Sequence, residues 1–316
     1  MAIGARPLVP SRLAPGGLLG HESLRRPTTR AAAYVALTKP RIIELLLITT
    51  VPPMVVAANG WPGSWLVLTT MFGGALAAGG ANAINMVIDR DIDRLMPRTQ
   101  GRPLVTGLLT PGEALRFALG LEVAAFAVLA VAANLLAATL AIAATTFYVF
   151  VYSLWLKRTT SHNIVIGGIA GCMPVLVGWA AVTNSLSWAP LVMFAIIFAW
   201  TPPHSWALAS KYVDDYRAAS VPMLPVVVTM AVAADQMLWW TGLLVAFSLV
   251  LAPVADLGWI YIGTALALGG GFLYMCQRLR RTPTQAMSMR VFVYSITYVT
   301  VLFASMALDV VVRNGV

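Results

Sequence analysis

Long apolar runs separated by short polar breaks extend from about residue 42 to the end of the chain. Each run is close to the ~20 residues that cross a bilayer as a helix. The runs are continuously apolar, whereas strands of a membrane barrel alternate residue by residue. We therefore predict an all-α polytopic membrane protein with nine transmembrane helices, at residues 42–60, 64–87, 112–131, 134–154, 163–183, 187–209, 223–251, 257–276 and 289–312.

The composition agrees with this interpretation. Hydrophobic residues make up 59% of the 316 residues, charged residues only 10%, and the mean hydropathy is +0.81. These values lie far outside the range of soluble globular domains, which excludes a soluble enzyme. An odd number of spans also predicts that the two termini lie on opposite sides of the membrane.

Nineteen of the 21 basic residues lie before the first predicted span or at alternate connections between the spans. These positions are Arg6, Arg12, Arg25, Arg26, Arg30, Lys39, Arg41, Arg90, Arg94, Arg98, Arg102, Lys157, Arg158, Lys211, Arg217, Arg278, Arg280, Arg281 and Arg290. The loops near residues 59, 134, 184 and 256 carry no Lys or Arg. The positive-inside rule then places the N-terminus and basic loops in the cytoplasm, at the inner (plasma) membrane of a bacterium, and the C-terminus outside. A mitochondrial inner membrane is the alternative.

The net charge of +9 is explained by this topology and by attraction to the anionic lipid bilayer, and we predict no nucleic-acid partner. Residues 1–33 are rich in Arg and lack the apolar segment of a secretory signal. We predict a disordered basic cytoplasmic tail at 1–33, followed by one nine-helix transmembrane domain at 34–316. A mitochondrial transit segment would have a similar composition.

Three carboxylates fall within five positions at the inner end of the second predicted span, in "NMVIDRDIDR" at 85–94. Residues four apart share a helix face, so Asn85, Asp89 and Asp93 form one stripe and Asp91 points elsewhere. Two carboxylates near lipid require a compensating cation, and Mg²⁺ prefers such oxygen ligands. The alternative is a solvated loop in which the acids pair with neighbouring arginines.

The following loop favours a diphosphate site. Arg94, Arg98 and Arg102 recur every four residues, and surplus cations beside a metal site suit a diphosphate. A second acidic cluster, Asp214 and Asp215, lies at the inner end of the sixth span. The weak internal repeat suggests two halves that bring their polar loops to one site. Metal ions there would neutralise a departing diphosphate, and a prenyl chain would occupy an apolar groove between helices.

Several segments carry a family resemblance. "NMVIDRDID" fits the NxxxDxxxD motif of UbiA-type intramembrane prenyltransferases, and its continuation is similar to the haem-farnesylating members of that family. Three further stretches agree: "YVALTKPRIIELLLITTVPPM" at 34–54, "YSLWLKRTTSHNIVIGGIAG" at 152–171 and "WTPPHSWALASKYVDDYRAASVPMLPVV" at 200–227. The resemblance covers essentially the whole chain from residue 34.

The resemblance implies nine helices around a central cavity, a UbiA-like architecture. It also implies Mg²⁺-dependent transfer of the farnesyl group of farnesyl diphosphate to a vinyl group of haem b. Water adds in the same overall reaction, giving haem O for terminal oxidases and releasing diphosphate. Haem b is thus a substrate, and a haem A synthase is a candidate partner.

The resemblance also assigns roles to residues. The implied metal ligands are Asn85, Asp89, Asp93, Asp214 and Asp215, and the catalytic set adds Lys211 and His204. The implied substrate contacts are Tyr152, Lys157, Arg158, Arg94, Arg98, Arg102 and Arg217. The second motif departs from the family pattern, because Lys211 stands four residues before Asp215 where a carboxylate is common. Either Lys211 contacts diphosphate directly or one ligand is missing.

Some features have simpler explanations. His204 either forms a buried hydrogen bond to a backbone carbonyl, or contacts the haem iron or moves a proton. Tyr152, Lys157 and Arg158 could equally anchor the helix at the interface. The glycine-rich runs 73–80 and 167–171 allow close helix contact, which explains them without a ligand.

Two other functions remain open from the residues. A prenyltransferase acting on an aromatic acid or quinone precursor would use the same diphosphate chemistry. A cation-coupled transporter would use the acidic clusters as ion sites, although the acids lie at helix ends and not in the middle of the membrane.

Overall fold

The computed structural model describes residues 27–315, and within that range all regular structure is helical. Most of the predicted tail, residues 1–26, lies outside the described residues. The α-helices are α1 (Arg30–Thr38), α2 (Pro40–Ile48), α3 (Val51–Ala58), α4 (Ser64–Ile88), α5 (Arg90–Leu95), α6 (Pro103–Thr106), α7 (Pro111–Ala132), α8 (Leu135–Thr146), α9 (Lys157–Thr159), α10 (Asn163–Gly167), α11 (Ile169–Thr183), α12 (Trp188–Ala209), α13 (Val213–Ala218), α14 (Leu224–Val227), α15 (Met230–Val254), α16 (Trp259–Arg281) and α17 (Gln285–Asn314). Two 3₁₀ turns, η1 (Pro97–Thr99) and η3 (Ser210–Tyr212), and one π-helix, η2 (Phe147–Leu156), complete the elements.

Within residues 27–315, eight helical segments are long and apolar enough to cross a membrane. A ninth is obtained if the bent pair Arg30–Thr38 and Ile43–Ala58 counts as one span. The predicted all-α polytopic fold is therefore confirmed.

The first predicted span, 42–60, is not one continuous helix. The chain is helical from Arg30, inside the segment that the sequence assigned to the tail, and it bends by 44° between Arg30–Thr38 and Ile43–Ala58, where the predicted span begins. Lys39 adopts a left-handed conformation with φ of 53°, and Pro40 disfavours the α conformation in the residue before it. A second break separates α2 from α3 at residues 49–50, just before two prolines that lack backbone N–H donors.

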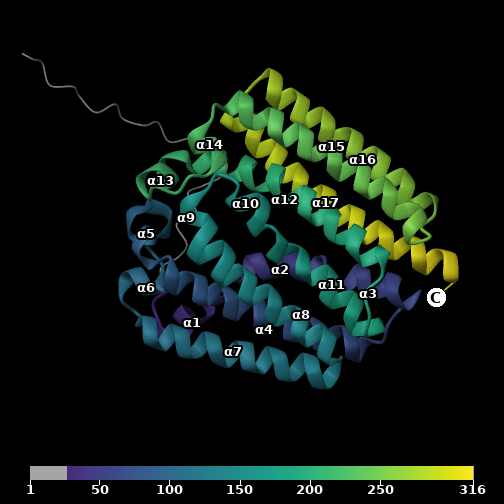
Figure 1. The fold of residues 1–316 in the computed structure, drawn as a ribbon, viewed down its shortest axis with the longest axis horizontal. Coiled ribbons are helices and arrows are strands. Elements are labelled where there is room, and N and C mark those ends of the chain that lie inside the picture. Colours follow the sequence, from purple (N-terminus) through teal and green to yellow (C-terminus); the bar gives the residue numbers. More distant parts are fainter. Residues whose placement is uncertain (1–26, 316) are drawn as a thin grey trace, which may run out of the picture.

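The helices form two groups with a connecting layer between them. Helices α4, α7 and α8 lie on one side and α12, α15, α16 and α17 on the other, with α2, α3 and α11 between the groups (Figure 1). Close contact between α4 and α7 depends on glycine. A Cβ atom at Gly73 would lie 2.6 Å from Leu129 Cγ, and one at Gly80 would lie 2.5 Å from Glu122 Oε1.

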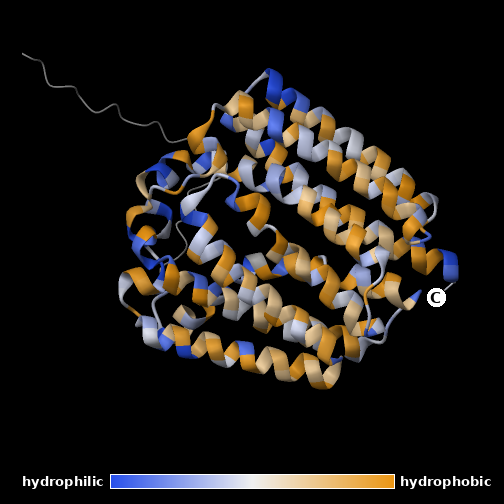
Figure 2. Ribbon diagram, viewed as in Figure 1, coloured by the Kyte–Doolittle hydropathy of each residue, from blue (hydrophilic) through white to orange (hydrophobic). Residues whose placement is uncertain are grey.

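Polar residues gather at the end of the bundle formed by α5, α9 and α13, whereas the helix lengths are mostly apolar (Figure 2). The opposite connections carry exposed tryptophans. Trp65, Trp188 and Trp259 are 74%, 77% and 86% exposed. Tryptophans in such positions are typical of a membrane interface.

Asp309 joins α17 to the start of α16 at the end that carries the C-terminus. Its side chain is 1% exposed, and its two oxygens accept hydrogen bonds from the N–H groups of Gly258, at 2.6 Å, and Tyr261, at 3.3 Å. Gly258 is the N-cap residue of α16. The carboxylate therefore satisfies free donors of the first helical turn and faces the positive end of the helix dipole.

We expect Asp309→Ala to lower the free energy of unfolding by about 1–3 kcal/mol, because two buried donors lose their acceptor. Thermal unfolding of the purified protein in detergent measures this as a lower Tm. The matched control is Asp256→Asn, since Asp256 is 93% exposed, asparagine tolerates its left-handed φ of 49°, and the change should cost no more than about 0.5 kcal/mol. Equal Tm values for the two variants would contradict the assignment.

Candidate functional site

Asn85, Asp89 and Asp93 form one buried stripe where α4 passes into α5. Their side chains are 3%, 0% and 1% exposed. The Nδ2 atom of Asn85 donates a hydrogen bond to Asp89 Oδ2 at 2.8 Å. Asp91, by contrast, is 59% exposed, as its place on another face of the helix predicted. The predicted stripe is therefore confirmed.

Cations from distant parts of the chain surround this stripe. Lys157 Nζ donates to Asp89 Oδ2, and Arg102 Nη1 donates to Asp93 Oδ2 at 2.6 Å. Both basic side chains are largely buried, at 13% and 14% exposed. The solvated-loop alternative does not apply to these two acids, since their cationic partners come from outside the α5 helix and are buried with them.

The hydrogen bonds of Arg158 go to a different partner from those of its neighbour Lys157, although its Nη2 atom also lies 3.9 Å from Asp89 Oδ1. Its guanidinium binds both oxygens of Asp91, at 2.6 and 2.7 Å, and also donates to the carbonyl of Ile88 at 3.1 Å. This bidentate pair lowers the pKa of Asp91 to about 2, mainly through the hydrogen bonds from Arg158. Arg158 therefore fastens the loop after α4 to η2 and α9, and in this arrangement it is a positioning residue more than a substrate contact.

The acidic stripe has the chemistry of a magnesium site. The Oδ1 atoms of Asp89 and Asp93 are buried and have no hydrogen-bond partner within the described part of the chain. Unpaired carboxylate oxygens are costly to bury, and they are available as ligands. No three His, Cys, Asp or Glu side chains of residues 27–315 could hold a metal together. Mg²⁺ prefers oxygen ligands and usually keeps several waters. Two carboxylates and an amide oxygen, with water and phosphate at the remaining coordination positions, match this preference.

The π-helix η2 lies next to the stripe and contacts it through Ser153. Ser153 Oγ donates to the carbonyl of Tyr148 at 2.9 Å and accepts from Asn85 Nδ2 at 3.0 Å. The rings of Tyr148 and Tyr152 stack with centroids 5.3 Å apart. Ser153 and Lys157, four positions apart, both face α4. Segments of π-helix occur frequently at functional sites, because the extra residue per turn redirects side chains.

Lys39 belongs to the site, although the sequence analysis assigned it no role. Its Nζ atom donates to Asn85 Oδ1 at 2.8 Å. Asn82 Nδ2 donates to the carbonyl of Thr38 at 3.0 Å, which ties the break between α1 and α2 to α4. The signal was present in the sequence, since a lysine before a proline at the inner end of a span indicates a break carrying a cation.

Arg98 joins the loop after α5 to the second acidic cluster. Its Nε atom lies 3.6 Å from Asp215 Oδ2, and its Nη2 atom donates to Tyr216 Oη at 3.3 Å. The guanidinium also lies over the rings of Tyr212 and Tyr216, at 5.1 and 5.3 Å from their centroids. The structure thus brings Asp215 toward the first cluster through one shared arginine.

Other predicted residues lie away from the buried stripe. Asp214 pairs with Arg217 at 2.7 Å, and their side chains are 96% and 60% exposed. Arg94 is exposed, and so is Lys211, whose Nζ lies 5.4 Å from the centroid of the Tyr212 ring. Helix α13 has less than two turns, and adjacent residues on a helix face different directions, so only one of the two aspartates can face the site. The structure favours Asp215 over Asp214.

His204 lies in α12, and its ring and hydrogen-bond contacts within the described residues do not reach the acidic stripe. Its ring stacks on that of Trp200 with ring centroids 4.1 Å apart, and its Nδ1 atom lies 2.8 Å from Ser295 Oγ. When Ser295 donates its one hydroxyl proton to the carbonyl of Phe292, 2.6 Å away, Nδ1 is the protonated nitrogen of His204. Nε2 then keeps its lone pair. The partner is a hydroxyl group and not the backbone carbonyl of the simpler alternative.

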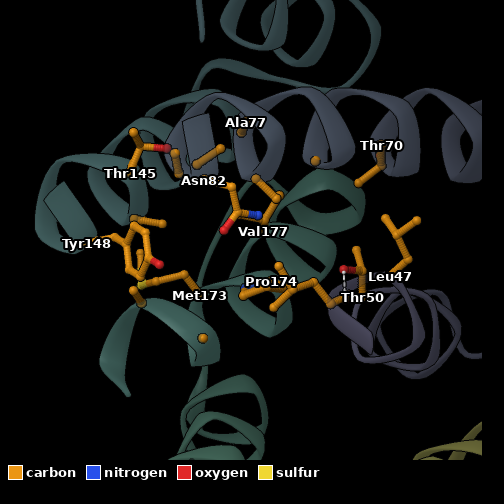
Figure 3. Close-up of a pocket in the computed structure, with 18 residues that line it drawn as sticks. Leu47, Thr50, Thr70, Ala77, Asn82, Thr145, Tyr148, Met173, Pro174 and Val177 are labelled. Carbon is orange, nitrogen blue, oxygen red and sulfur yellow. Dashed lines mark hydrogen bonds between the residues drawn. The ribbon is translucent and has the colours of Figure 1, made fainter. Parts of the chain in front are cut away.

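Two cavities lie inside the bundle, one walled in part by Asn82 of α4 and the other by Tyr152 of η2. The apolar cavity, of about 200 Å³, lies between α2, α4, α8 and α11; Leu47, Thr70, Ala77, Asn82, Tyr148 and Val177 are among its walls (Figure 3). The aromatic cavity, of about 220 Å³, is lined by Tyr152, Trp200 and Thr201 among others. Tyr148 and Gly171 belong to both walls. The two cavities therefore adjoin beneath η2.

Gly167 provides the space for Tyr152, because a Cβ atom at Gly167 would overlap the tyrosine ring. We expect Gly167→Ala to displace Tyr152 and η2, at a cost of about 1–3 kcal/mol for the overpacking, and to lower prenyl transfer accordingly. The control is Gly120→Ala on the exposed face of α7, where an added Cβ meets no atom within 4 Å. Steady-state kinetics and Tm values distinguish the two. Full activity of Gly167→Ala would show that the position of Tyr152 does not matter.

Comparison with known proteins agrees with this geometry. A model of the UbiA prenyltransferase family matches residues 46–304. The protoheme IX farnesyltransferase of Clavibacter michiganensis is 55% identical over 285 residues, which are 89% of this chain and 92% of that protein. The protoheme IX farnesyltransferase of Streptomyces coelicolor is 50% identical over 308 residues, covering 95% and 98% of the two chains.

Solved structures share the fold at low sequence identity. A digeranylgeranylglyceryl phosphate synthase superposes with a TM-score of 0.74 at 16% identity, over 89% of this chain and 99% of that chain. A UbiA homologue from Archaeoglobus fulgidus, bound to GPP and Mg²⁺, superposes with a TM-score of 0.60 at 15% identity, over 87% of this chain and 99% of that chain. Family model, close relatives and fold agree, and the chain belongs to the UbiA prenyltransferase family.

Proposed function

We propose that this protein transfers the farnesyl group of farnesyl diphosphate to a vinyl group of haem b, with addition of water, to give haem O and diphosphate. The observation that carries the proposal is the buried stripe of Asn85, Asp89 and Asp93 beside an apolar cavity. The acceptor and donor are supported by relatives, 50–55% identical, that are named protoheme IX farnesyltransferase.

Asn85, Asp89 and Asp93, with Asp215 from the second loop, are the residues that would hold magnesium. When bound, Mg²⁺ supplies positive charge that neutralises the diphosphate as it departs. Lys157, Arg102 and Arg98 add fixed cations around the same space. Because these side chains are held by hydrogen bonds and largely buried, they need little reorganisation when charge develops on the leaving group.

The proposed reaction breaks the bond between the farnesyl C1 and the diphosphate oxygen. The allylic carbon that results forms a new carbon–carbon bond with the terminal vinyl carbon of haem b. Water adds to the neighbouring carbon and loses one proton, so that a hydroxyethylfarnesyl group remains. The apolar cavity holds the prenyl chain away from water. The stacked rings of Tyr148 and Tyr152 offer π faces that favour a nearby cation.

In this proposal the acceptor, haem b, binds on the side of the aromatic cavity. Trp200 lines it and stacks on His204. The free Nε2 lone pair makes His204 a candidate for binding the haem iron or for accepting the proton released when water adds. His204 remains a proposal, as do the exposed Arg94, Lys211 and Arg217 as substrate contacts at the loop surface.

We also propose that the stripe faces the cytoplasm in a bacterial plasma membrane, with the C-terminus outside. The charge pattern of the loops and the bacterial relatives support this orientation. A haem A synthase, which would use the product, remains a candidate partner.

The test is transfer of radiolabel from labelled farnesyl diphosphate to competing acceptors by the purified protein with Mg²⁺. Haem b should be labelled, whereas an aromatic acid such as 4-hydroxybenzoate should not. Label on the aromatic acid alone would favour the quinone-precursor alternative. Cation-driven uptake into proteoliposomes, without any diphosphate release, would favour a transporter.

A further inference from the structure

Gly74 is unlike the other glycines of the run 73–80 in α4. A Cβ atom would lie 2.6 Å from Leu129 Cγ at Gly73, 3.2 Å from Thr38 at Gly79 and 2.5 Å from Glu122 at Gly80. At Gly74 it would meet no heavy atom within 4 Å. Glycine inside a helix costs roughly 1 kcal/mol relative to alanine. Helix packing therefore explains three of these glycines and leaves Gly74 without a structural reason.

The open space beside Gly74 is the apolar cavity, of which Gly74 forms part of the wall. The neighbouring wall residue Thr70 is fully buried, and its Oγ1 atom has no hydrogen-bond partner among the residues that the structure describes. A buried hydroxyl without a partner costs about 1–3 kcal/mol. Such a hydroxyl can donate weakly to a π system, and every isoprene unit carries one double bond. This end of the cavity thus has both room and chemistry for a prenyl chain.

The position of Gly74 along α4 matches the end of a farnesyl chain. Gly74 lies eleven residues before Asn85, or about 16 Å at 1.5 Å per residue. An isoprene unit adds four carbon–carbon bonds of about 1.5 Å, or roughly 5 Å when extended. The third unit of a farnesyl chain whose diphosphate lies at the acidic stripe therefore reaches roughly 10 to 15 Å into the bundle.

We infer that Gly74 determines the length of prenyl chain that the protein accepts. The missing side chain leaves room for the third isoprene unit, so that a larger residue at this position excludes farnesyl but still admits the two units of geranyl. The inference rests on the proposed function only in placing a prenyl diphosphate at the stripe. It does not depend on which acceptor the protein uses.

The experiment measures equilibrium binding of farnesyl diphosphate and geranyl diphosphate to the purified full-length protein with Mg²⁺, without any acceptor. The variants are Gly74→Ala, Gly74→Val and Gly74→Leu. The matched control is Gly263→Leu on α16, where an added Cβ also meets nothing within 4 Å but the position is exposed on the bundle surface. The ratio of the two Kd values, farnesyl over geranyl, is the readout.

We expect the ratio to rise stepwise through the series and to reach at least about tenfold in Gly74→Leu, as for an overfilled apolar pocket. Gly263→Leu should change it by no more than about twofold. An unchanged ratio, or equal weakening of both ligands, would overturn the inference. If Gly74→Leu does not fold, the ratios of the alanine and valine variants decide.

The proposed function fails separately from this inference. A shifted ratio in a protein that never labels haem b would leave the role of Gly74 intact and reject the acceptor. A constant ratio in a protein that farnesylates haem b would reject Gly74 alone. Wild-type protein that binds neither diphosphate would overturn both.

Discussion

Asp89→Asn should lower kcat/KM for farnesyl transfer by at least about 10²-fold while the protein stays folded in the membrane. Asparagine keeps the shape of Asp89 but removes the charge, so the buried Oδ1, which accepts no hydrogen bond among the described residues, can no longer serve as an anionic ligand. Removing one electrostatic contact to a developing charge costs about 10²–10³-fold in well-studied enzymes. Asp93→Asn should behave alike. The Mg²⁺ concentration for half-maximal activity should also rise.

Asp91→Asn is the matched control, because Asp91 lies in the same motif but is exposed and pairs with Arg158. An exposed pair contributes about 0–1 kcal/mol, so this variant should keep activity within about fivefold of wild type. We would compare kcat/KM from steady-state kinetics, and Tm from thermal unfolding, among the three variants. If Asp89→Asn and Asp93→Asn were both as active as Asp91→Asn, the metal assignment would be wrong.

Lys157→Met should raise the KM for farnesyl diphosphate and lower kcat/KM by about 10²-fold. Methionine preserves the length of the side chain but removes the ammonium group that contacts Asp89. The buried carboxylate would then lack its close cation, and the leaving group would lose a fixed positive charge. Breaking a buried pair in this way also destabilises a fold by about 3–5 kcal/mol, so we expect a lower Tm.

Arg158→Met is the control for Lys157→Met, since Lys157 donates a hydrogen bond to Asp89, whereas Arg158 donates to Asp91 and lies 3.9 Å from Asp89 Oδ1. Arg158 binds the exposed Asp91, and its loss should loosen the loop after α4 with a much smaller effect on KM. Kinetics with farnesyl diphosphate as the varied substrate separate the two. If Arg158→Met raised the KM for farnesyl diphosphate as much as Lys157→Met or more, Arg158 and not Lys157 would be the residue that contacts the diphosphate.

Much of the fold could be predicted because lipid imposes simple rules. Continuous apolar runs, placed between loops with and without basic residues, indicated both the number of spans and the difference between the two ends. The break at Lys39 was missed because hydropathy averages over a window and does not register a left-handed residue before a proline. A single helix at 42–60 was the natural but incomplete interpretation.

The first half of the site could also be predicted from spacing. The four-residue interval of Asn85, Asp89 and Asp93 places them on one face by helix geometry alone. Asp214 and Asp215 are adjacent, and no spacing rule says which of them faces the site when the helix is short. Contacts made across the fold, such as Ser153 with Asn85, have no local signal at all.

The π-helix is the clearest limit of prediction from the sequence. The residues of η2 read as an ordinary apolar span, yet the change of hydrogen-bond register directs Ser153 and Lys157 toward α4. Tyr152 depends in turn on Gly167, which lies in another helix. The glycine run of α4 looked uniform, and only the neighbours of each Cβ position distinguish Gly74 from the glycines that pack against α7.

Mass spectrometry of haems extracted after incubation of the purified protein with haem b, farnesyl diphosphate and Mg²⁺ tests the proposed activity most directly. A parallel sample with EDTA removes the metal. We expect a new haem, heavier by one farnesyl group plus water, in the Mg²⁺ sample and not in the EDTA sample. Unchanged haem b from a folded, diphosphate-binding sample would contradict haem farnesylation by this protein.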